Sequence, residues 1–391
     1  LLLFLSNLLY SQETDTSDLL SEFQKSKSQI SRGHLDSAIT SLTHITEVAL
    51  ENKYWVLLTS SKIELARVYE LQEDFDNTLK NYIELIRVLQ KNEIRDQLAI
   101  THFALGQDYE KYKIYNKAIK FYALAKTNFE YSNNYEKVVE SLSRQGDLYF
   151  IMENYELAES VLDTAIQFIK SHETGKNIIT YLQKQVNICE RQGRSDKVLS
   201  TYLEILDIYN QHNDHQSAIW IQNEIGYSYS EIGDYNMALS VLLESLEAST
   251  TFDVHDSVRI YILTNLAIAY SALDLNSVSI DTLSIVESYY KEKGQTGNLA
   301  RIQDLTAEVY LKQGNLEEAL KYSLESIENA KAHADLYLLK DSYKTLSDIY
   351  QELDDFKNGL KYFGLYSELN DSILNINAAK NLELNQLEQR V

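Results

Sequence analysis

A tyrosine returns at a nearly constant spacing along most of this chain, with a compact residue three positions before it and another nine positions after it. Each step spans about 40 residues, which is within the range of helical repeats. The steps are identical, except that the step from Tyr229 to Tyr270 is longer by one. The tyrosine positions are Tyr69, Tyr109, Tyr149, Tyr229, Tyr270, Tyr310 and Tyr350, with Cys189 in the same register. The compact residues are Ala66, Gly106, Gly146, Val186, Gly226, Ala267, Ala307 and Ser347 before them, and Thr78, Ala118, Ala158, Val198, Ala238, Ser279, Ala319 and Gly359 after them. A degenerate first copy, with Gly33 and Ala38, brings the prediction to nine copies.

Each copy is predicted to be two helices joined by a short turn. The chain has no proline and only 12 glycines, so helix-breaking residues are scarce. No segment alternates as a strand would. The predicted turn residues, which must permit a positive φ, are Gly33, Gly193, Gly233 and Gly314, with Glu73 and Asp354 as polar substitutes. The compact residues then mark where two helices approach closely, and the tyrosines fill the space between units.

Two segments, Gly226–Leu239 (GYSYSEIGDYNMAL) and Tyr310–Leu320 (YLKQGNLEEAL), resemble the signature of the tetratricopeptide repeat (TPR) family. The resemblance implies an all-α fold: a right-handed superhelical solenoid of about nine TPR-like helix pairs plus a C-terminal helix. The repeat period departs from the ~34 residues of that family, and the proline that often ends the second helix is missing. We therefore expect longer helices or longer connections than in the family.

The two ends of the chain do not follow the repeat pattern. Residues 1–12 begin with an apolar run that is either a truncated secretory signal or an apolar helix covering the first repeat. The solenoid is expected over residues 13–370. Residues 371–391 are expected to form a C-terminal helix, capped by Asp371 or Ser372. Its Leu384, Leu387 and Val391 have the spacing of a short coiled coil, which would allow dimerisation, although the helix could instead seal the last repeat.

Charge and cysteine content narrow the range of partners. The formal net charge is −22, and a surface this acidic repels nucleic-acid phosphates, so we expect no nucleic-acid partner for this segment. The same charge would attract a basic partner or would simply keep the chain soluble. Cys189 is the only cysteine, which excludes an internal disulfide and a multi-thiolate zinc site.

Stacked first helices line the concave surface in the TPR family, so the residues six and two positions before each tyrosine are expected to face a groove. These positions include Gln183, Asn187, Asn223, Tyr227, Gln107 and Arg67, and Trp220 flanks the three amides. These seven residues are the candidates for binding a protein or an extended peptide. Amides offer both a donor and an acceptor to a peptide main chain, and the two aromatic rings offer anchoring area. The alternative is that these polar residues only face solvent.

No arrangement of residues typical of catalysis is present. There is no phosphate loop or dinucleotide fingerprint. The pair His212 and His215 has no third ligand nearby and is expected to be a surface turn. Cys189 occupies a tyrosine position and is expected to be a buried filler. We therefore expect a chain that is not an enzyme and that has no cofactor and no metal.

The order of elements also resembles that of membrane-anchored bacterial sensor proteins. An apolar leader, a TPR array and the stretch Tyr366–Leu374 (YSELNDSIL) carry this resemblance. It implies the extracytoplasmic sensory input region of a sensor histidine kinase or a TPR-linked transcriptional regulator, on the periplasmic side of the inner membrane and attached only through segments outside this chain. The alternatives are a cytoplasmic location and a free-standing TPR scaffold that assembles a protein complex.

Overall fold

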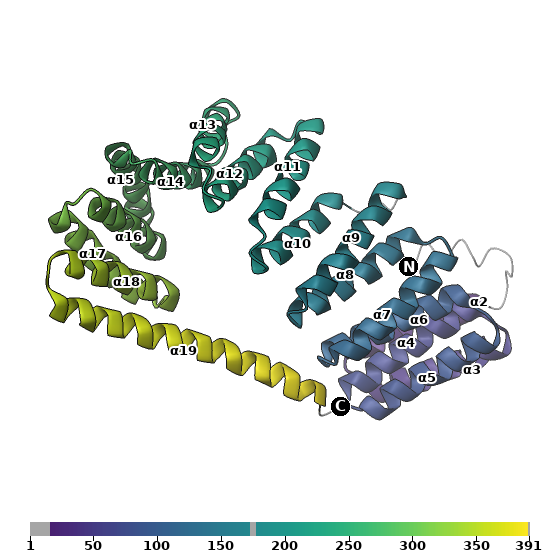
Figure 1. The fold of residues 1–391 in the computed structure, drawn as a ribbon. Helices are drawn as coiled ribbons and strands as arrows, with labels where there is room; N and C mark the ends of the chain where they lie inside the picture. Colours follow the sequence, from purple (N-terminus) through teal and green to yellow (C-terminus); the bar gives the residue numbers. More distant parts are fainter. Residues whose placement is uncertain (1–15, 173–176, 390–391) are drawn as a thin grey trace. The chain divides into compact units, whose positions relative to one another are not determined.

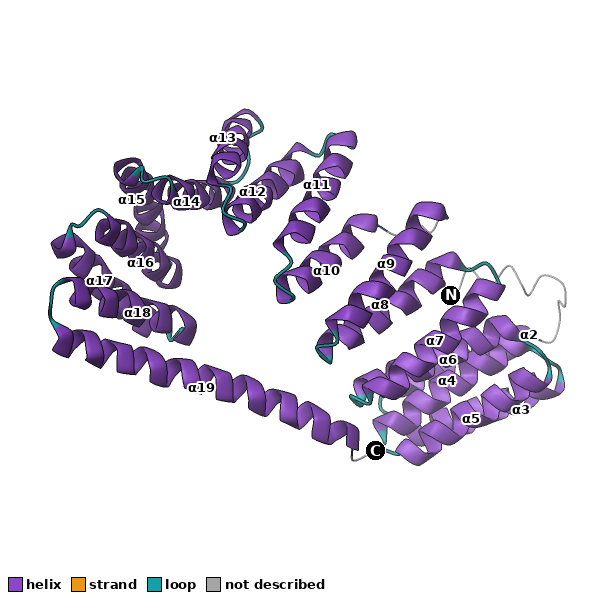
Figure 2. Cartoon of the chain, in the orientation of Figure 1, coloured by secondary structure: helices purple, strands orange, loops and turns teal. Residues whose placement is uncertain are grey.

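The computed structural model describes the backbone of residues 16–172 and 177–389, and it describes the side chains as far as residue 376. The described residues form 18 helices, α2 to α19, and contain no strand (Figure 2). The helices alternate as nine first helices and nine second helices (Figure 1). The predicted all-α solenoid of nine helix pairs is therefore confirmed. The expected leader of residues 1–12 lies outside the described residues.

The nine first helices carry even numbers and the nine second helices carry odd numbers. The first helices are α2 (Thr16–Ser31), α4 (Trp55–Leu71), α6 (Arg95–Lys111), α8 (Tyr135–Ile151), α10 (Ile178–Arg191), α12 (His215–Glu231), α14 (Asp256–Ala272), α16 (Thr296–Lys312) and α18 (Leu336–Glu352). The second helices are α3 (Leu35–Glu51), α5 (Phe75–Lys91), α7 (Tyr115–Tyr131), α9 (Tyr155–Ser171), α11 (Ser195–Gln211), α13 (Tyr235–Thr251), α15 (Asn276–Lys293), α17 (Leu316–His333) and α19 (Phe356–Gln389).

The long repeat period comes from long helices joined by short turns. Most helices have 17 residues, and most turns have three, as between Glu51 and Trp55. From α2 to α9 the turn between two repeats has the same length as the turn within a repeat, whereas later it has four residues between α13 and α14 and two between α15 and α16. The middle residue has a left-handed φ in both kinds of turn: Lys53 (60°), Glu73 (59°), Gly233 (83°) and Asp354 (58°) are examples. All six predicted turn residues adopt it. Longer helices therefore account for the departure from ~34 residues.

The compact residues lie where the two helices of a repeat touch. A Cβ added to Gly106 would stand 2.9 Å from the ring of Tyr122, and one added to Gly146 would stand 3.0 Å from Leu162. The tyrosines pack against second helices: the rings of Tyr350 and Tyr362 stack with centroids 5.6 Å apart. The periodic glycines and tyrosines are thus explained by close packing of helices.

The chain divides into two compact units, which we describe separately. One covers residues 1–181 together with 387–391, and the other covers residues 182–386. The core of the first unit is a cluster around Leu42, Ile45 and Leu85, all almost fully buried. The second unit has several smaller clusters, one around Leu283 and Val286 between α14, α15 and α16. The binding candidates with numbers above 182 all belong to this second unit.

The C-terminal helix differs from its prediction. No new helix begins at Asp371 or Ser372, because α19 runs without a break from Phe356 to Gln389. The Ser372 hydroxyl donates a hydrogen bond to the carbonyl oxygen of Glu368, 2.8 Å away, which is a contact inside a helix rather than a cap. The physical reason is that no proline or glycine follows Gly364 to stop the helix. Residues 371–389 are thus the continuation of the last second helix.

Candidate binding face

The first helices of neighbouring repeats contact one another directly. In the second unit α12 contacts α14, α14 contacts α16, and α16 contacts α18. Consecutive second helices in the described part of the chain make no contact of comparable extent. Because the first helices lie closer together, they form the inner side of this unit. We call the solvent-exposed side of α12, α14, α16 and α18 the first-helix face.

The residues two positions before each tyrosine are mostly exposed. Tyr227 on α12 is 39% exposed, and Asn187 on α10 is exposed as well. Gln107 on α6 and Arg67 on α4 are exposed in the first unit. The Arg67 guanidinium lies 3.6 Å from a carboxylate oxygen of Glu64 on its own helix. These positions are available to a partner.

Half of the residues six positions before each tyrosine are buried, which corrects the prediction for Asn223. Asn223 is only 2% exposed, and its amide oxygen accepts a hydrogen bond of 2.9 Å from Asn265 on α14. Its amide nitrogen donates to Glu224. This register points at the neighbouring first helix, so Phe103 and Ser143 are buried too. Asn223 therefore joins two repeats and does not offer its amide to a ligand, whereas Gln183 in the same register is exposed.

An exposed row that the sequence reasoning missed lies nine positions before each tyrosine. It consists of Trp220 on α12, Tyr261 on α14, Arg301 on α16 and Asp341 on α18, all exposed. The rings of Trp220 and Tyr261 meet edge to face with centroids 5.6 Å apart. In the sequence, Trp220 is a binding candidate only because it flanks the amide side chains of Asn187 and Asn223. Its spacing of seven residues from Tyr227 is two helical turns, which was the available signal for this row.

The other end of the first-helix face is acidic. Burial and the nearby Glu308 carboxylate raise the pKa of Asp304 to about 8. The Oδ1 atom of Asp304 is shielded from solvent and has no hydrogen-bond partner among the described residues. Burial also raises the pKa of Glu308. On α18 the Lys344 ammonium lies 2.6 Å from Asp348 Oδ2. The face thus runs from aromatic side chains on α12 and α14 to carboxylates on α16 and α18.

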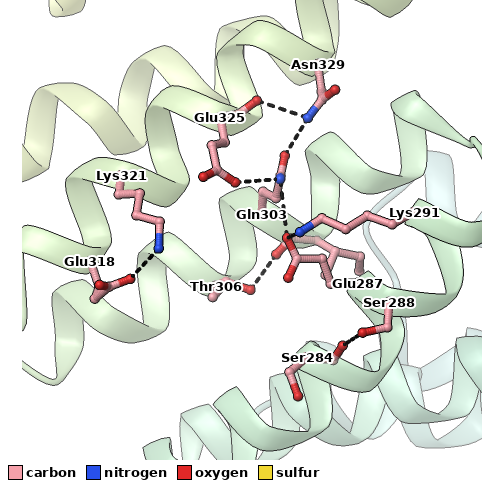
Figure 3. Close-up of polar contacts among 11 residues, drawn as sticks. Ser284, Glu287, Ser288, Lys291, Gln303, Thr306, Glu318, Lys321, Glu325 and Asn329 are labelled. Carbon is pink, nitrogen blue, oxygen red and sulfur yellow. Dashed lines mark hydrogen bonds and ion pairs between the residues drawn. The ribbon is translucent and has the colours of Figure 1, made fainter.

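A buried polar network lies behind this face, between α15, α16 and α17 (Figure 3). Gln303 is 2% exposed, and its amide nitrogen donates to Glu325 (3.0 Å) and Glu287 (3.3 Å). Its amide oxygen accepts from Asn329 at 2.8 Å. Lys291 pairs with Glu287 at 2.9 Å. Because the Gln303 amide is hydrogen-bonded at both its nitrogen and its oxygen, this network holds three helices together and is not a binding site.

Comparison with known proteins gives matches to solved structures alone. No family model matches this sequence, and no curated protein does. The apo form of RapI matches with a TM-score of 0.56 and 15% identity, over 91% of this chain and 98% of that chain. The apo form of the quorum sensor NprR from B. thuringiensis matches with a TM-score of 0.52 and 14% identity, over 90% of this chain and 99% of that chain.

A third match carries the repeat in its description. It is a Signal Transduction ATPase with Numerous Domains protein with a tetratricopeptide repeat sensor, from Pyrococcus horikoshii. The TM-score is 0.53 at 17% identity, over 86% of this chain and 54% of that chain, so our chain spans about half of that protein. The chain has the TPR fold. The helix pairs, the regular repeat register and these matches agree on it.

Several residues of this TPR chain take no part in the first-helix face. Cys189 is fully buried in a cluster with Val186 and Val198, as predicted for a filler. His212 and His215 flank the turn between α11 and α12, and the His215 ring stacks on Phe252 with centroids 4.0 Å apart. Within residues 16–172 and 177–389, no three His, Cys, Asp or Glu side chains are grouped to hold a metal. None of the helices searched there is both long and apolar enough to cross a membrane.

Proposed function

We propose that this chain is a non-catalytic TPR scaffold that binds a protein or an extended peptide on the first-helix face of its second unit. The observation that carries the proposal is the exposure of three large aromatic side chains on two adjacent first helices. Trp220 is 40% exposed, Tyr261 is 42% exposed and Tyr227 is 39% exposed. Tryptophan and tyrosine dominate the energetics of protein interfaces, because they bury a large area at a small cost in side-chain entropy.

The chemistry along the face favours a peptide that is apolar at one end and basic at the other. The aromatic rings on α12 and α14 suit an apolar anchor. Glu308 on α16 is exposed and suits a lysine or an arginine, since complementary charge fixes orientation and speeds encounter. Asp341 and Asp348 on α18 already pair with Lys340 and Lys344 of this chain. The overall charge of −22 acts in the same direction. Gln183 and Asn187 on α10 supply exposed amides for main-chain hydrogen bonds.

A selection from a random-peptide display library against the full chain tests this proposal. We expect enrichment of peptides with an aromatic or aliphatic residue followed by basic residues. The double variant Trp220→Ala with Tyr261→Ala should bind a selected peptide at least about 10-fold more weakly, since loss of an interface anchor costs roughly 2 kcal/mol. The control is Tyr131→Ala, an aromatic residue on α7 that is 66% exposed. Equal affinity of the double variant and the wild type would exclude this face.

Within a cell, we place this scaffold as the extracytoplasmic input region of a bacterial signal-transduction protein. Two proteins of similar fold are described as sensors, the quorum sensor NprR and the STAND protein with its repeat sensor, and the resemblance to membrane-anchored sensors adds the periplasmic location. A fusion of the native gene to alkaline phosphatase at Val391 should be active outside the cytoplasm. A fusion that is active only inside would favour the alternative, a cytoplasmic TPR adaptor.

The absence of catalysis is a separate part of the proposal. The fold does not decide it, because one solved structure of this fold is described as aspartyl phosphate phosphatase F from Bacillus subtilis. Our support is the lack of a phosphate loop in the sequence and the burial of Cys189. We expect no turnover of acyl phosphates above the buffer rate. Activity that disappears in Asp304→Asn would overturn this part and leave the binding proposal untouched.

A further inference from the structure

An apolar stripe on α19 is open to solvent. Phe356, Leu360 and Phe363 are 60%, 73% and 48% exposed, and Leu374 is 57% exposed. Their spacing of four, three and eleven residues places them on one side of a helix. We call these four residues the open face of α19. Large exposed apolar patches on a folded protein mark interaction sites.

The same register is buried on α7, which another repeat follows. Tyr115, Ile119 and Tyr122 on α7 occupy the positions of Phe356, Leu360 and Phe363, and they are 8%, 9% and 0% exposed. In α7 the following first helix, α8, packs against this side of the repeat. The open face therefore has the composition of an interface between two repeats, although no described helix covers it.

The aromatic residue at the start of this stripe, Phe356, lacks the ring contacts that its counterpart makes. Phe75 on α5 is the counterpart of Phe356. Its ring makes edge contacts with Tyr109 on the following first helix, α6, and with Tyr112 just after that helix, at centroid distances of 6.4 Å and 4.9 Å. At Phe356 the corresponding place is a hollow of about 280 Å³. Its wall on α18 is formed by Lys344, Ser347, Asp348 and Gln351.

The charges beside the open face change sign along α19. Lys357 and Lys361 lie in the part of the helix next to Phe356, and Glu368 and Asp371 lie one to two turns beyond Phe363. All four are exposed. At 100° per residue they fall on the same flank of the stripe. When two identical helices pack antiparallel, equal flanks meet in opposite directions. The lysines of one copy would then face the carboxylates of the other, whereas a parallel pair would bring opposite flanks together and leave these charges unpaired.

We propose that a second copy of this chain covers the open face, in a symmetric dimer built from two antiparallel α19 helices. The apolar stripes of both copies form the centre of the contact, and Leu374 of one copy approaches Phe356 and the hollow of the other. The lysine and carboxylate pairs set the direction. This contact is distinct from the coiled-coil seam of Leu384, Leu387 and Val391, and it does not depend on the proposed ligand.

Sedimentation equilibrium of the full chain at micromolar concentration tests the dimer. We expect the wild type to sediment as a dimer and the variant Leu360→Asp with Phe363→Asp as a monomer of unchanged helix content. The matched control is Ile285→Asp on α15, which replaces an apolar residue that is 56% exposed and away from α19; it should remain a dimer. A monomeric wild type would overturn the proposal. A dimer that survives Leu360→Asp with Phe363→Asp would do the same and would place the contact elsewhere, for example at Leu384 and Leu387.

Charge reversal tests the antiparallel direction. The variant Lys357→Glu with Lys361→Glu makes the flank wholly acidic, and Glu368→Lys with Asp371→Lys makes it wholly basic. We expect each variant alone to dimerise at least about 10-fold more weakly than the wild type, and an equimolar mixture of the two to recover the dimer. A mixture that stays as weak as its components would overturn the antiparallel arrangement.

Discussion

Gly226 on α12 lies directly against Leu242 on α13. A Cβ added to Gly226 would stand 2.5 Å from Cγ and 2.6 Å from Cδ2 of Leu242. Leu242 is fully buried, so it has no free space into which it can move. This contact sets the distance between the two helices of the sixth repeat, and the equivalent contacts at Gly106 and Gly146 set it in two others.

We expect Gly226→Ala to destabilise the fold. Alanine favours a helix by about 1 kcal/mol over glycine, but overpacking a core costs about 1–3 kcal/mol. At 2.5 Å from the branch point of Leu242, the overpacking cost should prevail. Urea denaturation followed by circular dichroism measures the difference. In the control Gly359→Ala, the nearest atom would stand at 3.6 Å, an ordinary contact, so stability should stay equal or rise. A gain in stability at both sites would contradict the packing argument.

Asp304→Asn should change the pH dependence of stability. In the folded chain, burial and Glu308 raise the pKa of Asp304 to about 8, from an ordinary value of 3.8. Between about pH 4 and pH 8 the unfolded chain releases this proton while the folded chain keeps it, so the free energy of unfolding falls as pH rises. The variant Asp304→Asn has no carboxyl group there, so its free energy of unfolding does not fall in this way. Its melting temperature should equal that of the wild type near pH 4 and exceed it by several degrees, on the order of 3 °C per kcal/mol, at pH 8.

A second carboxylate provides a control of opposite sign. Asp355 caps α19, and its hydrogen bonds with the Asn358 backbone and side chain lower its pKa. Its charged form therefore stabilises the fold above the unfolded pKa, and that stability is lost as pH falls. Asp355→Asn should match the wild type at low pH and be less stable at neutral pH. The raised pKa of Asp304 and the lowered pKa of Asp355 would be contradicted if the melting temperature of each variant differed from that of the wild type by the same amount at every pH.

The buried amide of Gln303 should be costly to remove. Gln303→Ala leaves Glu287, Glu325 and Asn329 each without one hydrogen bond in a buried setting. An unsatisfied buried polar group costs about 1–3 kcal/mol. Gln303→Glu should be worse, because it adds a third carboxylate between Glu287 and Glu325. Hydrogen exchange should show faster opening confined to α15, α16 and α17. The exposed Gln216→Ala is the matched control, and a similar loss there would refute a specific role for the network.

The left-handed turn positions offer a way to stabilise the chain. Ala334 follows α17 with a φ of 57°, and Gly233 follows α12 with a φ of 83°. A side chain in this conformation costs about 1–2 kcal/mol, and glycine avoids that cost. Ala334→Gly should raise the free energy of unfolding by about 1 kcal/mol, and Gly233→Ala should lower it by a similar amount. Changes of the same sign in both variants would show that the backbone conformation does not decide the effect.

The fold was predictable because its rules are local and repeated. Gly226 and the tyrosines signal close helix packing at every copy, and nine copies average out exceptions such as Cys189. The half-period, which is one helix and one turn long, has no sequence signal, because most turns between repeats use another residue, such as Lys53, Glu93 or Asn133, where glycine would mark them. Only the backbone conformation shows that these different residues occupy the same left-handed position of a turn.

The binding face was predicted less well, because exposure at a given register depends on the neighbouring helix. Asn223 and Tyr227 are four residues apart on one helix, yet Asn265 on α14 covers the first and leaves the second open. Sequence spacing gives the side of a helix, but not how closely the next helix approaches. Likewise, the continuity of α19 depends on the absence of a stop signal after Gly364, whereas the possible caps Asp371 and Ser372 suggested a new start.

The equal length of the two kinds of turn from α2 to α9 has a consequence for how such a chain can change in evolution. In that part of the chain every turn has three residues and a left-handed middle residue, so a duplication or deletion that begins at one kind of turn and ends at the other still rejoins the helices through a junction of the same length. The gene can therefore gain or lose repeats at many breakpoints without changing the length or conformation of a turn. Arrays of this kind should vary in repeat number more readily than arrays whose two connections differ.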